Sequence, residues 1–226
     1  MIVLADVNRL YRSDEVETTA LKSIELQIDE GEFVAIMGPS GCGKSTLLNI
    51  LGTIDRPTSG KYMFRDLEVT DMPEAELARL RRDNLGFVFQ SFNLIDELTV
   101  AENVELGIVY RKWAGKDRRA RVMAAMDRVG IAHRAKHYPH QLSGGQQQRA
   151  AIARAIVGQP SLILADEPTG NLDTENGAQV MGILQSLNED GATVVMVTHS
   201  PSHADMAKRR IDMLDGRIVV SARREI

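Results

Sequence analysis

Short apolar runs alternate with helical patterns along most of the chain. The runs cover residues 24–28, 33–37, 85–89, 162–165, 193–198, 210–214 and 217–220. Several are continuously apolar and β-branched, which is typical of strands buried on both faces of a parallel sheet. A later segment shows the spacing i, i+3, i+4, i+7 of one apolar helix face, at Val180, Ile183, Leu184 and Leu187. The alternation predicts an α/β fold in which helices cover a sheet.

Two regions depart from this alternation. Residues 91–159 show helical patterns at 100–109, 116–129 and 146–157 without a convincing strand, which predicts a helical insertion. The first thirty residues, together with 61–69, indicate a small antiparallel β layer. We therefore expect one domain over 1–226, with a core of about 1–90 and 160–226 and a helical subdomain of about 91–159.

Composition narrows the possible partners. The chain has 226 residues, 43% hydrophobic and 26% charged, which is ordinary for a globular protein. Its net charge of −4 argues against a nucleic-acid partner, because such proteins usually carry a basic surface. The longest apolar runs, such as 33–37 and 194–197, fall far short of the roughly 20 residues that span a bilayer. A membrane role would therefore have to come through a partner.

A glycine-rich motif follows the apolar run 33–37. It consists of Gly38, Pro39, Ser40, Gly41, Cys42, Gly43, Lys44 and Ser45, and Thr46 continues into a predicted helix. The order fits the phosphate loop G-x-x-x-x-G-K-[ST], in which glycines let backbone N–H groups turn toward one anion at a helix N-terminus. Lys44 supplies charge for the β- and γ-phosphates, and Ser45 offers a hydroxyl to Mg²⁺. The motif predicts ATP binding and hydrolysis.

Cys42 occupies one of the unspecified positions of this motif and is the one cysteine of the chain. It therefore cannot form an intramolecular disulfide. We interpret it as a small filler residue whose thiol is accessible to reagents.

Polar residues end two later apolar runs. Asp166 and Glu167 follow 162–165, and neighbouring strand residues point to opposite sides, so the two acids can act differently. Asp166 is suited to hold Mg²⁺ through water, and Glu167 to polarise the attacking water. Solvated charges at a strand end are the structural alternative, but the upstream phosphate loop favours catalysis. His199 follows 193–198, where it could bind a γ-phosphate or be merely structural.

A second Ser-Gly-Gly turn precedes the helical pattern at 146–157. The run Leu142, Ser143, Gly144, Gly145 and Gln146 resembles the LSGGQ signature of the ATP-binding cassette (ABC) family. A turn of this kind at a helix start is another anion site by the same physics. The resemblance implies a P-loop NTPase (RecA-like) core in the ABC ATPase architecture. It also implies two Mg·ATP held between two copies of the chain, because in that family one subunit's signature caps the other subunit's γ-phosphate.

The resemblance extends to four further positions. Tyr11 is similar to the aromatic residue that stacks on adenine, although an ordinary strand tyrosine is the alternative. Gln90 resembles the Q-loop glutamine that senses Mg²⁺ and the attacking water, and the run Asn171, Leu172 and Asp173 resembles the D-loop that crosses the dimer interface. His199 resembles the switch histidine of the family.

The runs 51–60 and 164–173 resemble ATPases of lipoprotein-releasing and macrolide-exporter systems. That resemblance implies a cytoplasmic ATPase held on the inner face of the membrane by an integral permease-type subunit. Ser200 is a departure, since many relatives have aspartate there. Two alternatives remain: an ATPase regulator of a non-transport membrane partner, as in cell division, and a soluble ABC protein acting on DNA or the ribosome. The latter usually carries paired cassettes or coiled-coil insertions, which this sequence lacks.

Two surfaces are candidates for that partner. In the family, the region 91–104 forms a groove for a short helix of the membrane subunit, which could be lined by Phe92, Leu94, Ile95 and Leu98. The alternative is that these residues pack the insertion. The second candidate is a basic run that comprises Arg111, Lys112, Lys116, Arg118, Arg119 and Arg121. It is either a solvated helix face or a surface that contacts lipid headgroups or an acidic segment of the partner.

Overall fold

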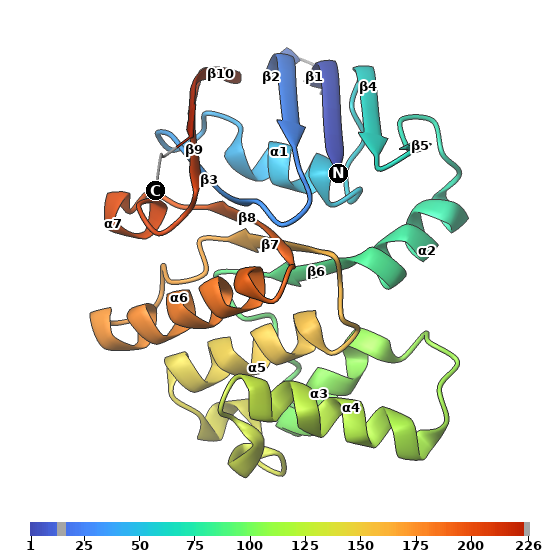
Figure 1. The fold of residues 1–226 in the computed structure, drawn as a ribbon, viewed down its shortest axis with the longest axis vertical. Coiled ribbons are helices and arrows are strands. Elements are labelled where there is room, and N and C mark those ends of the chain that lie inside the picture. The colour runs from blue at the N-terminus through green and yellow to red at the C-terminus, as the bar shows by residue number, and fades with distance from the viewer. Residues whose placement is uncertain (13–16, 224–226) are drawn as a thin grey trace. The chain divides into compact units, whose positions relative to one another are not determined.

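The chain divides into two compact units in the computed structural model, which describes residues 1–12 and 17–223 (Figure 1). The first unit comprises Met1–Arg79 and Thr193–Ile226, and the second comprises Leu80–Ala192. The helical subdomain expected at 91–159 falls inside the second unit.

The predicted antiparallel layer is present in the first unit. Its strands are β1 (Ile2–Arg12), β2 (Glu17–Ile28), β4 (Ser59–Phe64) and β5 (Leu67–Glu68), in the order β2-β1-β4-β5. β1 pairs antiparallel with both β2 and β4. Ile2, Leu4 and Val7 of β1 are buried. β2 begins well before the apolar run 24–28, because hydrogen bonds to β1 stabilise polar residues that no apolar pattern marks.

A second set of strands in the first unit positions the phosphate loop. These strands are β3 (Phe33–Met37), β8 (Thr193–Val197), β9 (Arg209–Leu214) and β10 (Arg217–Arg223). β3 pairs parallel with β8 and β9, and β10 pairs antiparallel with β9. Every residue of β3 and β8 is buried, as their apolar runs predict. Helix α1 (Lys44–Leu51) follows β3 and contacts β8 and β2, and the short α7 (Pro201–Ala204) follows β8.

The second unit combines a parallel strand pair with helices. β6 (Leu85–Val88) and β7 (Leu162–Asp166) pair in register. The helices are α3 (Val100–Glu105), a 3₁₀ turn (Leu106–Ile108), α4 (Gly115–Arg128), α5 (Gly144–Ile156) and α6 (Thr174–Glu189). α5 contacts α3, α4, α6 and β6, so it is the central helix of this unit. The helical patterns at 100–109, 116–129 and 146–157 are confirmed with small shifts at their ends.

The apolar pattern did not reveal helix α2 (Glu74–Asn84), which buries only Leu77 and Leu80 among its residues. Its acidic first turn and basic last turn complement the helix dipole and were the available signal. Among the residues that the structure describes, no helix is both long enough and apolar enough to cross a bilayer.

Candidate active site

The glycine-rich loop 38–45 joins β3 to α1 in the first unit. Gly38, Gly41 and Gly43 have φ values of 153°, 78° and 101°. A Cβ at Gly43 would lie 2.5 Å from the carbonyl oxygen of Ala20, so the backbone there approaches β2 too closely for a side chain. Gly43 also caps α1 without a side-chain hydrogen bond. The first-turn N–H groups are therefore not occupied by a capping side chain, which suits an anion at this helix start.

Lys44 folds back over the loop. Its Nζ donates to the carbonyl oxygens of Gly38 and Pro39, each at 2.8 Å. Cys42, within the loop, has 4% of its surface exposed, and its Sγ is 4.0 Å from Lys44 Nζ. The residue is the small filler expected, but the expected access of thiol reagents is wrong because Cys42 is buried.

His199 follows β8 at the same edge of the sheet as the phosphate loop. Ile36 of β3 pairs with Val197 of β8, and the N–H of Thr198 donates to the carbonyl oxygen of Ile36 at 3.1 Å. His199 is exposed just beyond this pairing. The adjacent Ser200 caps α7, where its side chain accepts from a backbone N–H. Serine and aspartate cap helices about equally well, so the departure from the family pattern preserves this turn.

Tyr11 is held by contacts of the first unit. Its hydroxyl donates to Asp55 Oδ2 at 2.7 Å, and the Arg9 guanidinium lies 4.4 Å from the centre of its ring. Arg9 also forms a 2.8 Å ion pair with Asp55, on the loop after α1. Tyr11 as a whole is 41% exposed. Arg9 covers one face of the Tyr11 ring. Stacking of this tyrosine on adenine stays a prediction.

In the second unit, the acidic pair opens a tight turn. β7 ends at Asp166, and Glu167 has a φ of 46°, which turns the chain sharply away from the strand. The N–H of Gly170 donates back to the carbonyl oxygen of Glu167 at 3.0 Å. The expectation for the two acids assumed strand geometry at both residues, whereas Glu167 adopts a left-handed backbone conformation.

The Ser-Gly-Gly turn packs against the start of α6. Ser143 Oγ accepts from the N–H of Gln146 at 3.3 Å, and Gln146 Oε1 accepts from the N–H of Ser143 at 3.1 Å, which is a capping box. A Cβ at Gly145 would lie 2.0 Å from Asn176 Oδ1. Hydrogen bonds from the backbone and side chain of Asn176 hold the pKa of Asp173 below its usual value.

Gln90 is tied to the D-loop in the same unit. Its Nε2 donates to Asn171 Oδ1 at 3.3 Å, and Asn171 Nδ2 donates to the carbonyl oxygen of Gln90 at 3.1 Å. This pairing assigns the amide nitrogen of Gln90 to Asn171 and leaves Oε1 as the acceptor. The second unit therefore contains Gln90, Asp166, Glu167, Asp173 and Ser143–Gln146.

The donors predicted for a metal fit Mg²⁺ in chemistry. They are the hydroxyl of Ser45, the amide oxygen of Gln90 and the carboxylate of Asp166, all hard oxygen ligands. Ser45 belongs to the first unit, and the other two belong to the second. Residues 1–12 and 17–223 contain no group of three or more His, Cys, Asp or Glu side chains that could hold a metal.

The backbone of the expected docking segment, 91–104, is bonded to an arginine that the sequence analysis did not single out. Arg154 of α5 donates to the carbonyl oxygens of Phe92, at 2.7 Å, and of Asn93. Among the groove candidates, Ile95 is 43% exposed, whereas Phe92, Leu94 and Leu98 are half-buried. An arginine within the apolar stretch of α5 was the available signal, because a buried guanidinium requires partners.

The basic run is partly occupied by contacts of its own unit. Arg111 donates to the carbonyl oxygen of Arg82 at 2.7 Å, Arg118 pairs with Glu105 at 3.2 Å, and the Arg121 guanidinium lies 4.1 Å from the centre of the Trp113 ring. The exposed members of the run are Lys112, Lys116 and Arg119.

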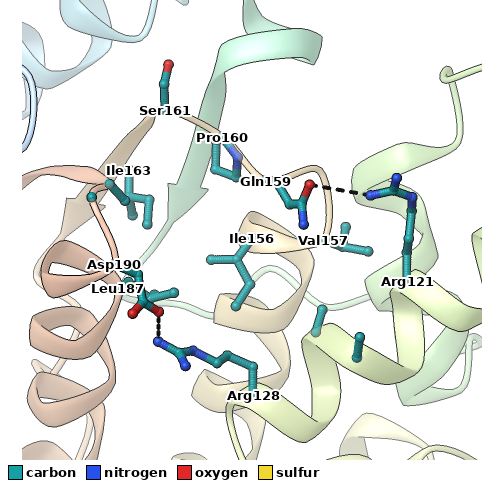
Figure 2. A pocket seen from close by; sticks show the side chains of 14 residues that line it. Arg121, Arg128, Ile156, Val157, Gln159, Pro160, Ser161, Ile163, Leu187 and Asp190 are labelled. Carbon is teal, nitrogen blue, oxygen red and sulfur yellow. Dashed lines mark hydrogen bonds and ion pairs between the residues drawn. The ribbon is translucent and has the colours of Figure 1, made fainter.

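A cavity of about 570 Å³ lies elsewhere in the second unit (Figure 2). Arg121 bonds to Gln159 and Arg128 pairs with Asp190 among the side chains that line it. No residue predicted for nucleotide binding or catalysis lines this cavity, although Arg121 of the basic run does, so it is separate from the candidate active site.

Comparisons with known proteins identify the family of this chain. A family model described as ABC transporter matches residues 21–170. The uncharacterized ABC transporter ATP-binding protein MJ1508 of Methanocaldococcus jannaschii is 51% identical over 219 residues, 97% of this chain and 98% of that protein. The macrolide export ATP-binding/permease protein MacB 1/2 of Paracoccus denitrificans is 50% identical over 223 residues, 99% of this chain but 33% of that protein.

Solved structures of ABC cassettes also resemble this chain. One is described as a dimeric, post-hydrolysis state of the ATP-binding cassette MJ0796 bound to ADP and Pi; it is 46% identical, covers 100% of both chains and has a TM-score of 0.92. Another, a dimeric structure of MJ0796 as a bacterial ABC transporter cassette, has a TM-score of 0.93 at the same identity.

Proposed function

Because this chain belongs to the ABC transporter family, as an ATP-binding and ATP-hydrolysing subunit, we propose that two copies of it close on two ATP molecules to drive a membrane partner. The observation that carries the proposal is the presence of two glycine-bearing helix starts in one chain, at α1 and α5. The relative MJ0796 is described as dimeric and bound to ADP and Pi, which supports the same arrangement here.

Within this arrangement, the first unit binds the phosphates. The N–H groups of the loop 38–45 and the ammonium of Lys44 hold the β- and γ-phosphates, and His199 donates to the γ-phosphate. Tyr11 stacks on the adenine. Mg²⁺, when bound through Ser45, Gln90 and Asp166, neutralises part of the phosphate charge.

The second unit supplies the hydrolytic groups. Glu167 orients and polarises the attacking water, and Gln90 belongs to the same unit. Ser143, Gly144 and Gly145 of the second copy donate hydrogen bonds to the γ-phosphate, while Asp173 lies at the interface between the copies. Catalysis then rests on positioning and charge stabilisation, as phosphoryl transfer to water requires.

The membrane partner is proposed from the relatives. In the MacB proteins, an ATP-binding part similar to this chain occupies about a third of a protein described as an ATP-binding/permease protein. We infer that a separate permease-type subunit serves this chain and holds it on the inner face of the membrane. The segment around Ile95, whose backbone Arg154 fixes at Phe92 and Asn93, is the surface for it.

Co-purification tests the membrane partner. The tagged chain is co-expressed with the membrane protein of the adjacent reading frame and extracted in detergent. We expect a stable complex that Ile95→Asp disrupts, because a buried carboxylate opposes an apolar contact. Exposed Val219→Asp, on β10 of the first unit, is the matched control. A complex that tolerates Ile95→Asp would contradict this docking surface.

Glu167→Gln tests the catalytic proposal. The amide keeps the shape of the carboxylate but cannot polarise water, so we expect turnover to fall about 100-fold or more. ATP binding is retained, and size-exclusion chromatography with Mg·ATP should show a trapped dimer. Glu189→Gln, an exposed change at the end of α6, is the control. Steady-state hydrolysis by Glu167→Gln at the wild-type rate would refute the role.

A further inference from the structure

We propose that Gln148 is a positioning residue for hydrolysis, which holds the backbone beside Glu167 against the helix that carries the Ser-Gly-Gly turn. This inference rests on the role proposed above for Glu167. It adds a residue whose side chain is fully buried and which acts through that carboxylate rather than on the nucleotide.

A single hydrogen bond carries the contact. Gln148 lies on the buried side of α5 with 0% of its surface exposed. Its Nε2 donates to the carbonyl oxygen of Pro168 at 2.6 Å. Pro168 directly follows Glu167 in the chain, and both partners belong to the second unit. The bond therefore joins α5 to the residue next to the catalytic carboxylate.

The turn at Glu167 needs such support. A φ of 46° is a conformation that residues other than glycine rarely adopt, and a following proline restricts Glu167 further. Conformations of this kind persist where the surrounding structure over-determines them. The hydrogen bond from the N–H of Gly170 to the carbonyl oxygen of Glu167 connects two residues of the same turn. Gln148 ties it to a helix.

The amide oxygen of Gln148 indicates why the residue is a glutamine rather than an apolar residue. Gln148 Oε1 is buried without a hydrogen-bond partner among the residues that the structure describes. A buried unpaired amide oxygen disfavours folding, and methionine would fill similar space without it. The glutamine is therefore explained by what its nitrogen does, which is to hold Pro168.

The position of Gln148 on α5 gives this contact a consequence. The same helix begins at the Ser143 cap, which is proposed to face the nucleotide of the second copy. Because a helix moves as a rigid element, a shift of α5 would move the Pro168 carbonyl and reorient Glu167 of the same chain. Gln148 thus couples the site that a chain completes on its partner copy to the carboxylate of its own site.

Gln148→Met removes the donor while keeping the volume. We expect kcat to fall roughly 10- to 100-fold, because small displacements of a catalytic group cost rate rather than binding. KM and the dissociation constant for ATP should stay within about two-fold of wild type. Gln179→Met, an exposed change on α6, is the matched control and should leave both unchanged. A wild-type kcat in folded Gln148→Met would overturn the proposal.

Gln148→Glu provides a readout that simple packing would not move, and it carries the test if the methionine variant does not fold. A buried carboxyl group has a raised pKa, and only its protonated form can donate to Pro168. We expect the ratio of variant to wild-type kcat to rise as the pH falls from about 8 to about 6. A ratio that does not change with pH would overturn the positioning role.

The double variant Gln148→Met with Glu167→Gln separates this proposal from the one it rests on. If Gln148 acts through Glu167, the residual turnover of Glu167→Gln should not fall further in the double variant. A further fall of the full size would overturn the inference. If Glu167→Gln itself hydrolyses ATP normally, the proposed function fails; if only Gln148→Met does so, the inference alone fails.

Discussion

The starts of α1 and α5 are built from similar residues but in opposite ways. α1 follows Gly43, whose left-handed backbone caps the helix without any side-chain bond. α5 follows Ser143, whose hydroxyl and backbone are both bonded to Gln146 in a capping box. The first helix start therefore donates no hydrogen bond to the side chain of its N-cap residue, whereas the second satisfies part of its own N–H groups.

The charges at the two helix starts differ as well. Lys44 brings a full positive charge to the loop before α1, where it bonds the carbonyl oxygens of Gly38 and Pro39. The first turn of α5 has no basic residue, and its charge is only the partial charge of the helix dipole. We infer that α1 provides the binding affinity for ATP, and that α5 contributes only after nucleotide is bound.

Lys44→Ala should have the largest effect on this comparison. Loss of the full charge should weaken Mg·ATP binding to the isolated subunit and lower turnover roughly 1,000-fold, because charge stabilisation dominates phosphoryl transfer. Calorimetric titration and steady-state hydrolysis measure the two effects. The exposed Lys61→Ala on β4 should leave both intact. Undiminished ATP binding by Lys44→Ala would remove the distinction between the two helix starts.

Ser143→Arg should separate binding from turnover. The bulky side chain blocks the start of α5, so turnover should fall roughly 100-fold, as when one transition-state donor is lost. ATP binding to the isolated subunit should stay within about two-fold of wild type, since α1 supplies it. If Ser143→Arg also abolished binding, α5 would belong to the binding site of its own chain, and the two-copy arrangement would be wrong.

Alanine at the two glycines should distinguish a rigid backbone contact from an adjustable one. Gly43→Ala meets the Ala20 carbonyl at a positive φ, so the free energy of unfolding without nucleotide should fall by about 1–3 kcal/mol. The Cβ added by Gly145→Ala would instead clash with the side chain of Asn176, which can rotate away. That rotation breaks one hydrogen bond, so the free energy of unfolding should fall by about 1 kcal/mol.

Denaturant titration of the same variants provides the control. Gly182→Ala, within α6 where a Cβ meets nothing within 4 Å, should raise the free energy of unfolding by up to about 1 kcal/mol. A larger loss at Gly145 than at Gly43 would reverse the comparison.

The smallest effect is expected for Ser143→Ala, which removes one helix cap. Its free energy of unfolding should fall by roughly 0.5–1 kcal/mol, and Ser143→Thr should restore most of it. An unchanged free energy of unfolding for Ser143→Ala would mean that the capping box does not stabilise α5.

Much of the fold could be predicted from the apolar pattern alone. β3, β7 and β8 are short runs buried along nearly their whole length, and the sequence marks them within a residue or two. The pattern failed where hydrogen bonds or charges, rather than apolar burial, stabilise an element. The first half of β2 is held by pairing with β1, and α2 buries little beyond Leu77 and Leu80.

The candidate site divides in the same way. The phosphate loop, the acidic pair and the Ser-Gly-Gly turn are each a short continuous run of residues. The spacing of residue types within each run is therefore enough to predict its chemistry. The burial of Cys42, the left-handed turn at Glu167 and the contacts of Asn176 with Gly145 involve neighbours that are distant in the chain or backbone angles that no spacing encodes.

By itself, the sequence determined the residues on which the proposed chemistry rests: the glycine-rich loop 38–45, the acids Asp166 and Glu167, and the Ser-Gly-Gly turn at 143–145 in an α/β chain. Tertiary structure alone decided how these parts are held. It bonds Gln90 to Asn171 and Gln148 to Pro168, across 81 and 20 positions of the chain. The physical reason is that residue types carry chemistry locally, whereas the orientation of a group depends on close packing and hydrogen bonds between segments that meet only when the chain folds.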